Sequence, residues 1–166
     1  MKKIILLVLS FSFGLGVYAQ TVVEAAVSNE DFSTLVTALK AADLVGALSS
    51  EGPFTVFAPN NAAFSKIDSE TLGSLLKPEN VKALSNILTY HVVSGKLMAS
   101  DVVNALKTGY GKVELEALNG QTLTALSKDG KIYLKDKQGN MSEIIATDVT
   151  GSNGVIHVIN SVVMPE

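Results

Sequence analysis

The sequence predicts an α+β fold, with helices in the first half of the chain and strands in the second. In the first half, apolar residues recur at the i, i+3, i+4, i+7 spacing of an amphipathic helix, for example across residues 32–39. In the second half, β-branched and aromatic runs are separated by Asn119-Gly120 and Asp129-Gly130, dipeptides that favour tight hairpin turns. Helices packed against a twisted antiparallel sheet would satisfy both patterns.

The first half is predicted to form a series of short helices around a strand. Residues 54–57 are mostly apolar, and Pro59 ends this strand because its ring fixes φ and removes a backbone donor. Asn60 then offers a side-chain oxygen to cap the next helix, and Asn29 or Asp31 offers the same to the helix at 32–39. The predicted helices span residues 21–27, 32–39, 44–48, 61–67, 69–76 and 81–88.

The second half is predicted to consist mostly of strands. A short strand at residues 90–93 is followed by the Ser94-Gly95 turn and by the last helix, which Ser100 caps and which runs to Leu106. The final strand is nearly all apolar, so we expect it to lie in the interior of the sheet. The later strands span residues 112–118, 121–126, 131–135 and 155–159.

The first 19 residues have the pattern of a secretory signal peptide. Lys2 and Lys3 form a positive start, an apolar stretch follows, and Val17-Tyr18-Ala19 fits a cleavage site, so we expect the mature chain to begin at Gln20. The apolar stretch is shorter than the roughly 20 residues that a membrane span needs. We therefore expect export, no membrane span, and one domain at residues 20–166.

Composition argues against nucleic acid as a partner and bears on the site of export. The 166-residue chain has 13 basic residues, all of them Lys, a formal net charge of −3, and neither Cys nor Trp. Because an acidic chain without Arg lacks the preferred side chain for phosphate and base-edge recognition, we expect no nucleic-acid binding. Without Cys the chain can form no disulfide and carry no lipobox lipid, which indicates export to a bacterial periplasm or beyond.

Three stretches carry the strongest functional signal. They are FTVFAPNNAAF at residues 54–64, NILTYHVVSGKL at residues 86–97 and NGVIHVINSVVMP at residues 153–165. In this order they resemble the leading box, the Tyr-His motif and the closing box of the fasciclin domain family. Asn60 stands where that family usually has Thr, and Asn160 where Asp is common, but both keep a hydrogen-bond acceptor.

This resemblance implies a wedge-shaped fold in which a β-sandwich-like antiparallel sheet is flanked by helices. It also implies a secreted or cell-surface module for cell adhesion or protein association, whose partner is an envelope or extracellular matrix protein. We expect no cofactor and no enzymatic activity, since the chain has no Cys nucleophile, no Gly-x-Ser-x-Gly elbow and no Gly-rich phosphate loop. The alternative is a soluble envelope module that binds a small molecule or a glycan.

Tyr90 and His91 are the first candidates for partner binding, because the family links the Tyr-His motif to receptor adhesion. The structural alternative is that both are buried where a helix gives way to a strand, with hydrogen bonds to the backbone. His157 lies in the apolar run 155–159, so we expect it to be a core histidine. Two His without Cys supply only half of a tetrahedral zinc site, so we expect no metal.

The second candidate surface is the 94–101 segment, which directly follows the Tyr-His motif. Lys96, Leu97, Met98 and Asp101 place apolar and charged side chains in a short connection, a combination that suits a small protein-binding patch. The alternative is that Leu97 and Met98 simply pack beneath the helix that follows. These six residues, from the motif and from the segment, are the candidate site.

Overall fold

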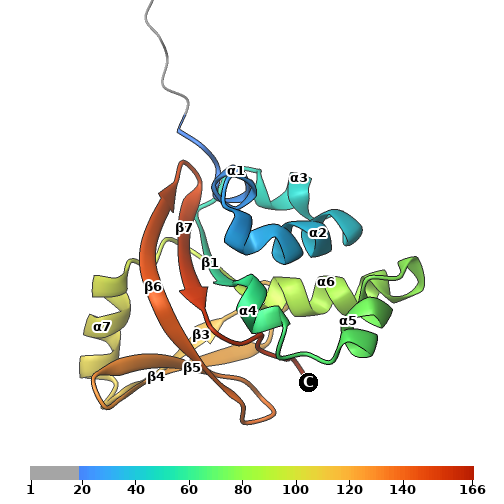
Figure 1. The fold of residues 1–166 in the computed structure, drawn as a ribbon. Coiled ribbons are helices and arrows are strands. Elements are labelled where there is room, and N and C mark those ends of the chain that lie inside the picture. Colours follow the sequence, from blue (N-terminus) through green and yellow to red (C-terminus); the bar gives the residue numbers. More distant parts are fainter. Residues whose placement is uncertain (1–18) are drawn as a thin grey trace, which may run out of the picture.

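The computed structural model describes residues 19–166 and has the α+β architecture that the sequence predicts (Figure 1). The predicted leader, apart from Ala19, lies outside the described residues. Within residues 19–166, no helix has the length and apolar character needed to cross a membrane. The elements in chain order are α1 (Val22–Val27), a 3₁₀ turn η1 (Glu30–Phe32), α2 (Ser33–Ala41), α3 (Val45–Leu48), β1 (Phe54–Pro59), α4 (Asn61–Phe64), α5 (Ser69–Leu75), a 3₁₀ turn η2 (Pro78–Asn80), α6 (Val81–Tyr90), β2 (Val92–Ser94), α7 (Ala99–Thr108), β3 (Lys112–Glu116), β4 (Thr122–Lys128), β5 (Lys131–Lys135), β6 (Met141–Gly151) and β7 (Gly154–Ile159).

The strands form one continuous sheet in the order β2-β1-β7-β6-β5-β4-β3. The long strand β6 is where this sheet turns over, because residues 141–143 pair with β5 and the rest of the strand pairs with β7. Register shifts between residues 144 and 149 mark β-bulges, which bend a strand and increase its twist. An antiparallel bridge between Val93 and Ala117 joins the two end strands, so the sheet is nearly a closed barrel.

The sheet departs from the predicted antiparallel arrangement in one pair. β1 and β7 run parallel, from Phe54 opposite Gly154 to Pro59 opposite Ile159, whereas the other five ladders in the described part of the chain are antiparallel. A parallel pair needs a long crossover, and here the crossover contains every element from α4 to β6. No local turn pattern indicates a connection of this length, so the parallel pairing cannot be predicted from neighbouring residues.

Two hydrophobic cores lie on the two faces of the sheet. The first is formed with the helices from α1 to α6, and it buries all four apolar residues of the predicted 32–39 stripe. The second fills the inside of the barrel beneath α7. β7 contributes Ile156 to the first core and Ile159 to the second, which confirms the prediction that it is an interior strand.

Most of the predicted helices and turns are confirmed, with differences at their ends. Asn29 caps the 3₁₀ turn before α2, and Asn60 caps α4 by accepting the Ala63 N–H at 2.9 Å. The helix predicted at 61–67 ends earlier, at Phe64. Both predicted hairpins are present, linking β3 to β4 and β4 to β5.

Two local predictions are wrong, and one strand was missed. The strand predicted at 90–93 begins only at Val92, because Tyr90 is still the last residue of α6. Ser100 does not cap α7, because the helix begins at Ala99 and its N-cap is Met98, two residues before Ser100. β6 was not predicted at all, because most of its side chains are exposed and its bulges break the alternation of apolar and polar residues.

Candidate functional site

Tyr90 and His91 lie in the interior of the protein. Tyr90 is 0% exposed, and its hydroxyl donates to the Thr122 carbonyl oxygen at 3.1 Å. Burial raises the pKa of this phenol. His91 is the C-cap of α6 and is 2% exposed. Neither side chain can touch a partner in this conformation, so the fold favours the structural alternative for the pair.

His91 fastens the end of α6 to the C-terminal segment. Its Nδ1–H donates to the Ile87 carbonyl oxygen at 2.8 Å, and its Nε2 accepts the Val163 N–H at 3.1 Å. These two partners require a neutral ring, because a charged imidazolium has two donors and no acceptor. Burial lowers the pKa of His91 to about 4, so the ring is neutral near pH 7.

Further side chains hold the same C-terminal segment against the sheet. The buried Ser142 hydroxyl accepts the Ser161 N–H at 3.1 Å and donates to the Ser161 carbonyl oxygen at 2.8 Å. Asn160 accepts the Glu143 N–H at 3.0 Å, so Asn supplies the acceptor expected at this position of the closing box. The Tyr-His motif and the closing box therefore both help to hold the C-terminal segment against the rest of the fold.

The 94–101 segment is held from below by two buried side chains of the sheet. Thr55 in β1 is 0% exposed; its hydroxyl donates to the Gly95 carbonyl oxygen at 2.6 Å and accepts the Leu97 N–H at 2.9 Å. His157 in β7 is 1% exposed, and its Nε2–H donates to the Leu97 carbonyl oxygen at 2.7 Å. Both backbone polar groups of Leu97 are thus bonded to the interior of the protein.

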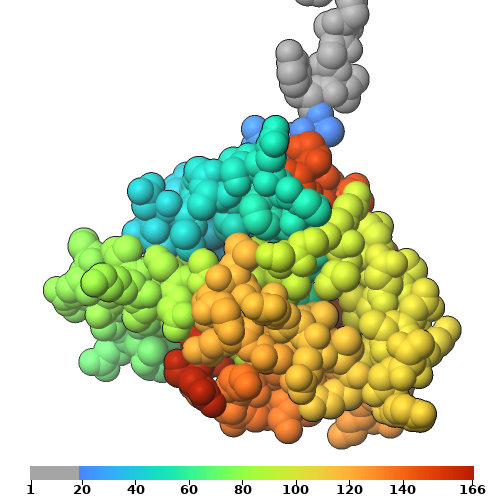
Figure 2. Space-filling model, turned by 180° about the vertical axis from the view of Figure 1, so that it is seen from behind, coloured from blue at the N-terminus to red at the C-terminus, as the bar shows by residue number. Residues whose placement is uncertain are grey.

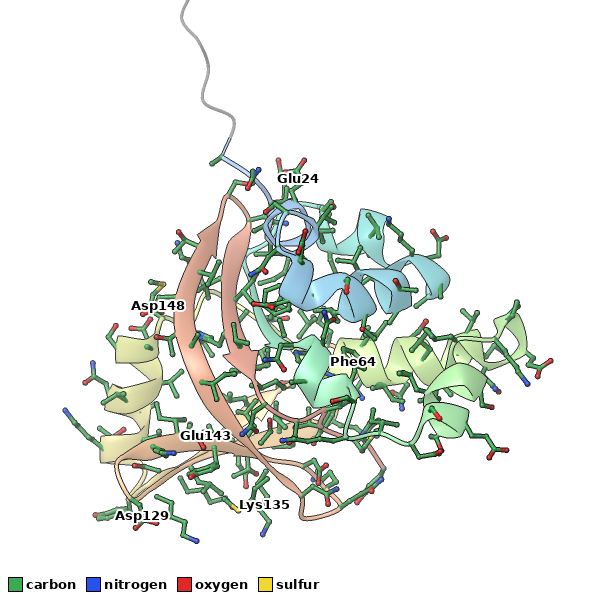
Figure 3. The ribbon with its side chains drawn as sticks, in the orientation of Figure 1. Glu24, Phe64, Asp129, Lys135, Glu143 and Asp148 are labelled. Atoms are coloured by element: carbon green, nitrogen blue, oxygen red, sulfur yellow. The ribbon has the colours of Figure 1, made fainter. Side chains whose placement is uncertain are left out.

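Two carboxylates fix the start of α7. Asp148, on β6 (Figure 3), accepts the Ala99 N–H at 2.8 Å, and Asp101 accepts the Met98 N–H at 2.9 Å. Negative charge is stabilising here because the first N–H groups of a helix lack intrahelical partners. The Asp148 N–H points to Nδ1 of His157 at 3.4 Å, consistent with the proton of that ring on Nε2.

The structure brings four of the six predicted site residues together at the surface. Lys96 and Asp101 are exposed, and Leu97 and Met98 are half-buried. Leu97 packs against the second core, as the alternative for that residue predicted. Of the predicted site residues on this segment, a partner could therefore reach the side chains of Lys96, Met98 and Asp101.

Sequence reasoning missed Thr55 and Asp148 as supports of this segment. The signal for Thr55 was a hydroxyl between apolar residues of a core strand, because a buried hydroxyl needs hydrogen-bond partners. Asp148 lies on β6, which was not predicted, so nothing pointed to it. His157 was expected to be a core histidine, and its burial and two hydrogen bonds confirm this.

A groove of 490 Å³ borders the 94–101 segment, between the end strands of the sheet. Figure 2 shows this side of the molecule, where the β3–β4 hairpin (orange) lies against the chain that leads into α7 (yellow-green). The charged residues among those that line the groove are both glutamates. The lining residues are Val93, Ser94, Leu97, Glu114, Leu115, Glu116, Ala117, Leu118 and Gly120.

The two histidines do not form a shared metal site. In His91 and in His157, both ring nitrogens are bonded to backbone groups. Over residues 19–166, no three His, Asp or Glu side chains gather in a way that could hold a metal ion.

Comparison with protein families matches the Fasciclin domain over residues 30–165. The chain belongs to the fasciclin domain family. The FAS1 domain pair of the insect cell adhesion molecule Fasciclin I has the same fold, with a TM-score of 0.76 over 89% of this chain and 51% of that chain. The identity in this comparison is 21%, so the likeness concerns the fold alone. It confirms the predicted fasciclin-like wedge.

Relatives of this fasciclin domain occur in bacteria and in animals. Protein sll1483 of the cyanobacterium Synechocystis is 52% identical over 147 residues, which cover 89% of this chain and 74% of the relative. The transforming growth factor-beta-induced protein ig-h3 of the pig is 35% identical over 145 residues. That match covers 87% of this chain but 19% of ig-h3, so it concerns a small part of the larger protein.

Proposed function

We propose that this fasciclin domain is exported and mediates adhesion or protein association at the cell envelope or in the extracellular matrix. The observation that carries the proposal is the 94–101 segment, whose backbone is bonded to the sheet by Thr55, His157 and Asp148. A segment held in this way is ordered before a partner arrives, so binding costs little conformational entropy.

The exposed chemistry of the segment suits a protein partner. Lys96 and Asp101 supply opposite charges, and the half-buried Met98 between them supplies a flexible apolar side chain. A small apolar centre with a polar rim is the usual composition of a protein-binding patch. In this proposal Tyr90 and His91 do not contact the partner. They have a structural role, because they hold α6 and the C-terminal segment in place.

Export is the second part of the proposal. It is supported by the pattern Lys2-Lys3, apolar stretch and Val17-Tyr18-Ala19, with cleavage before Gln20. Removal of Lys2 and Lys3 changes the formal net charge from −3 to −5. The mature domain is then an acidic protein of the periplasm or the extracellular space.

Binding of a small molecule or glycan is the alternative use of the same region. The groove beside the segment has a suitable volume, since ligand sites commonly enclose about 300–1,000 Å³. None of the residues that line it is aromatic, so it lacks the flat surface on which sugar rings stack. This composition favours a protein partner over a glycan.

The proposal is tested by capture from native material. Immobilised mature protein is exposed to solubilised envelope and to matrix extract, and the captured proteins are crosslinked and identified by mass spectrometry. Lys96→Glu combined with Met98→Asp should abolish specific capture. This variant should stay folded, because Asp is a favoured N-cap residue and Met98 is the N-cap of α7.

A matched control makes the same chemical changes elsewhere on the surface. Lys82→Glu with Met141→Asp alters an exposed Lys in α6 and an exposed Met in β6. This variant should capture the same proteins as the unmodified domain. Equal capture by both double variants would place the adhesive surface outside the 94–101 segment.

A further inference from the structure

The end strands β2 and β3 approach each other at one point and then separate. Their contact is the bridge between Val93 and Ala117, where the Leu118 N–H donates to the Val92 carbonyl oxygen at 2.8 Å. No other ladder joins β2 to β3 within the described chain. The 490 Å³ groove opens beyond this bridge.

The backbone of β3 faces this groove. Successive residues of a strand direct their N–H and C=O groups to opposite edges. On this edge the Leu118 N–H is bonded to β2 and the Lys112 N–H to the Gly109 carbonyl oxygen, so the stretch between them, at Glu114 and Glu116, directs its backbone groups to the groove. The opposite edge of β3 is occupied by β4. An edge of this kind is a template for another strand.

The side chains around this edge divide into an apolar floor and an acidic rim. Leu115 is buried, and the half-buried Leu97 lies beside it in the groove. Glu114 and Glu116 are on the other face of β3 and are exposed. Lys112 forms an exposed ion pair with Glu114 at 3.1 Å, which leaves Glu116 as the uncompensated charge of the rim.

We propose that the outer edge of β3 binds an extended basic peptide segment of the partner protein as an additional strand. Alternate side chains of the peptide would be apolar and enter the groove toward Leu97 and Leu115. The others would be Lys or Arg and stand opposite Glu114 and Glu116, where opposite charges on paired strands attract. The backbone provides affinity and the alternation provides specificity. This inference rests on the proposed function, because it names the chemistry of that partner.

The charges argue for a basic partner segment and against a second copy of this chain. The groove presents glutamates, and the chain as a whole is acidic, with a formal net charge of −3. Two copies would therefore meet with like net charge, whereas a Lys- or Arg-rich segment is attracted to both the rim and the domain.

The test uses the mature protein and a synthetic seven-residue peptide in which Lys and Val alternate. Binding is measured by calorimetry at low and physiological salt. The alternating peptide should bind, and a peptide of the same composition with its Lys residues grouped at one end should bind at least about tenfold more weakly, since grouped charges cannot all meet one face of the strand. A peptide with Glu in place of Lys should not bind.

Backbone methylation separates strand pairing from charge attraction alone. Two further peptides carry N-methyl groups on all Lys residues or on all Val residues, so that each lacks the donors of one edge. One of them should lose binding and the other should keep it, because an added strand pairs through one edge. Equal binding by both would overturn the proposal, since simple electrostatic adsorption needs no backbone donor.

Charge reversal on the protein provides the complementary evidence. The first double variant, Glu114→Lys with Glu116→Lys, should no longer bind the Lys peptide and should bind the Glu peptide. The control variant carries Glu51→Lys with Glu79→Lys, at exposed positions elsewhere. It should bind the peptides as the unmodified protein does. Unchanged peptide preference in the first variant, or dimerisation through β3 in sedimentation, would overturn the proposal.

The capture experiment described above distinguishes failure of the strand proposal from failure of the proposed function. If no peptide binds but capture still depends on Lys96 and Met98, the strand proposal alone is wrong. If neither result is obtained, the proposed function is wrong as well.

Discussion

His157 and Leu97 are joined by a hydrogen bond of 2.7 Å across 60 residues of sequence. The donor is a ring nitrogen on an interior strand, and the acceptor is a backbone carbonyl of a surface connection. The hydroxyl of Thr55 binds the N–H of the same residue. The shape of the 94–101 segment is thus determined by side chains of the sheet core, and this coupling is open to measurement.

Thr55→Val should loosen the 94–101 segment without changing the volume of the core. Val has the shape of Thr but leaves the Gly95 carbonyl and the Leu97 N–H without partners, which should cost about 1–3 kcal/mol of unfolding free energy. The free energy is measured by urea denaturation, and hydrogen exchange of the Leu97 amide should accelerate. Thr55→Ser keeps the hydroxyl and should retain slow exchange. Equal exchange in Val and Ser variants would contradict the assigned role.

His91→Ala should damage the fold before it damages any interface. The change leaves a cavity and removes the partners of the Ile87 carbonyl and the Val163 N–H, at a cost of about 2–4 kcal/mol. Chemical denaturation and capture from envelope extract are measured on the same preparation. An unchanged denaturation midpoint together with lost capture would make His91 a contact residue.

The free energy of unfolding should decrease as the pH is lowered between the unfolded-state and folded-state pKa values of His91. Burial lowers its pKa in the folded state to about 4 from the ordinary 6.5. Between these values the unfolded chain binds the proton and the folded chain does not, so stability is complete above pH 6.5 and declines toward pH 4. The full loss from this group is about 3 kcal/mol.

His91→Gln provides the comparison for this pH dependence. Gln cannot titrate, so the slope of unfolding free energy against pH between 6.5 and 4 should be smaller than in the unmodified protein. Urea denaturation at half-unit pH intervals gives both slopes. Parallel slopes would mean that other groups, carboxylates above all, determine the acid sensitivity.

The exported product should begin at Gln20. Lys2-Lys3, the apolar stretch and Val17-Tyr18-Ala19 together predict cleavage after Ala19. N-terminal sequencing of the protein recovered from the envelope fraction or the medium checks this. Recovery of the chain with an intact Met1 in the membrane fraction would refute it.

The features that the sequence predicted well are those encoded by neighbouring residues. Helical spacing located α2, Asn-Gly and Asp-Gly located two hairpins, and the apolar run at 155–159 located β7. The parallel pairing of β1 with β7 depends on elements far apart in the chain, so no local pattern encodes it. β6 escaped prediction because its outward side chains, including Ile145 and Val149, are apolar yet exposed and its bulges disrupt the period of two.

Of the candidate site, the sequence likewise indicated only the part that neighbouring residues encode. Lys96, Met98 and Asp101 were chosen because they follow the Tyr-His motif along the chain, and the structure brings them to the surface. The residues that hold them in place come from three other strands. Their contribution depends on tertiary contacts such as the one between Asp148 and Ala99, which spans 49 residues.

Asp148 allows the two contributions at the start of α7 to be separated. Its carboxylate accepts the Ala99 N–H, and its backbone has a φ of 61°, in the left-handed region that most residues avoid. Asp148→Ala should lose the acceptor at about 1 kcal/mol and add left-handed strain of about 1–2 kcal/mol. Asp148→Gly should lose the acceptor without this strain, because Gly adopts the left-handed conformation freely.

Asp148→Asn completes this series, since Asn keeps an acceptor and tolerates the left-handed region. Unfolding free energies should therefore fall in the order Asp, Asn, Gly, Ala. Capture from envelope extract should follow the presence of the acceptor instead, with Asn close to Asp and with Gly and Ala both weakened. If capture by the Gly variant matches that of the unmodified protein, the bond between Asp148 and Ala99 contributes to stability alone and does not shape the binding surface.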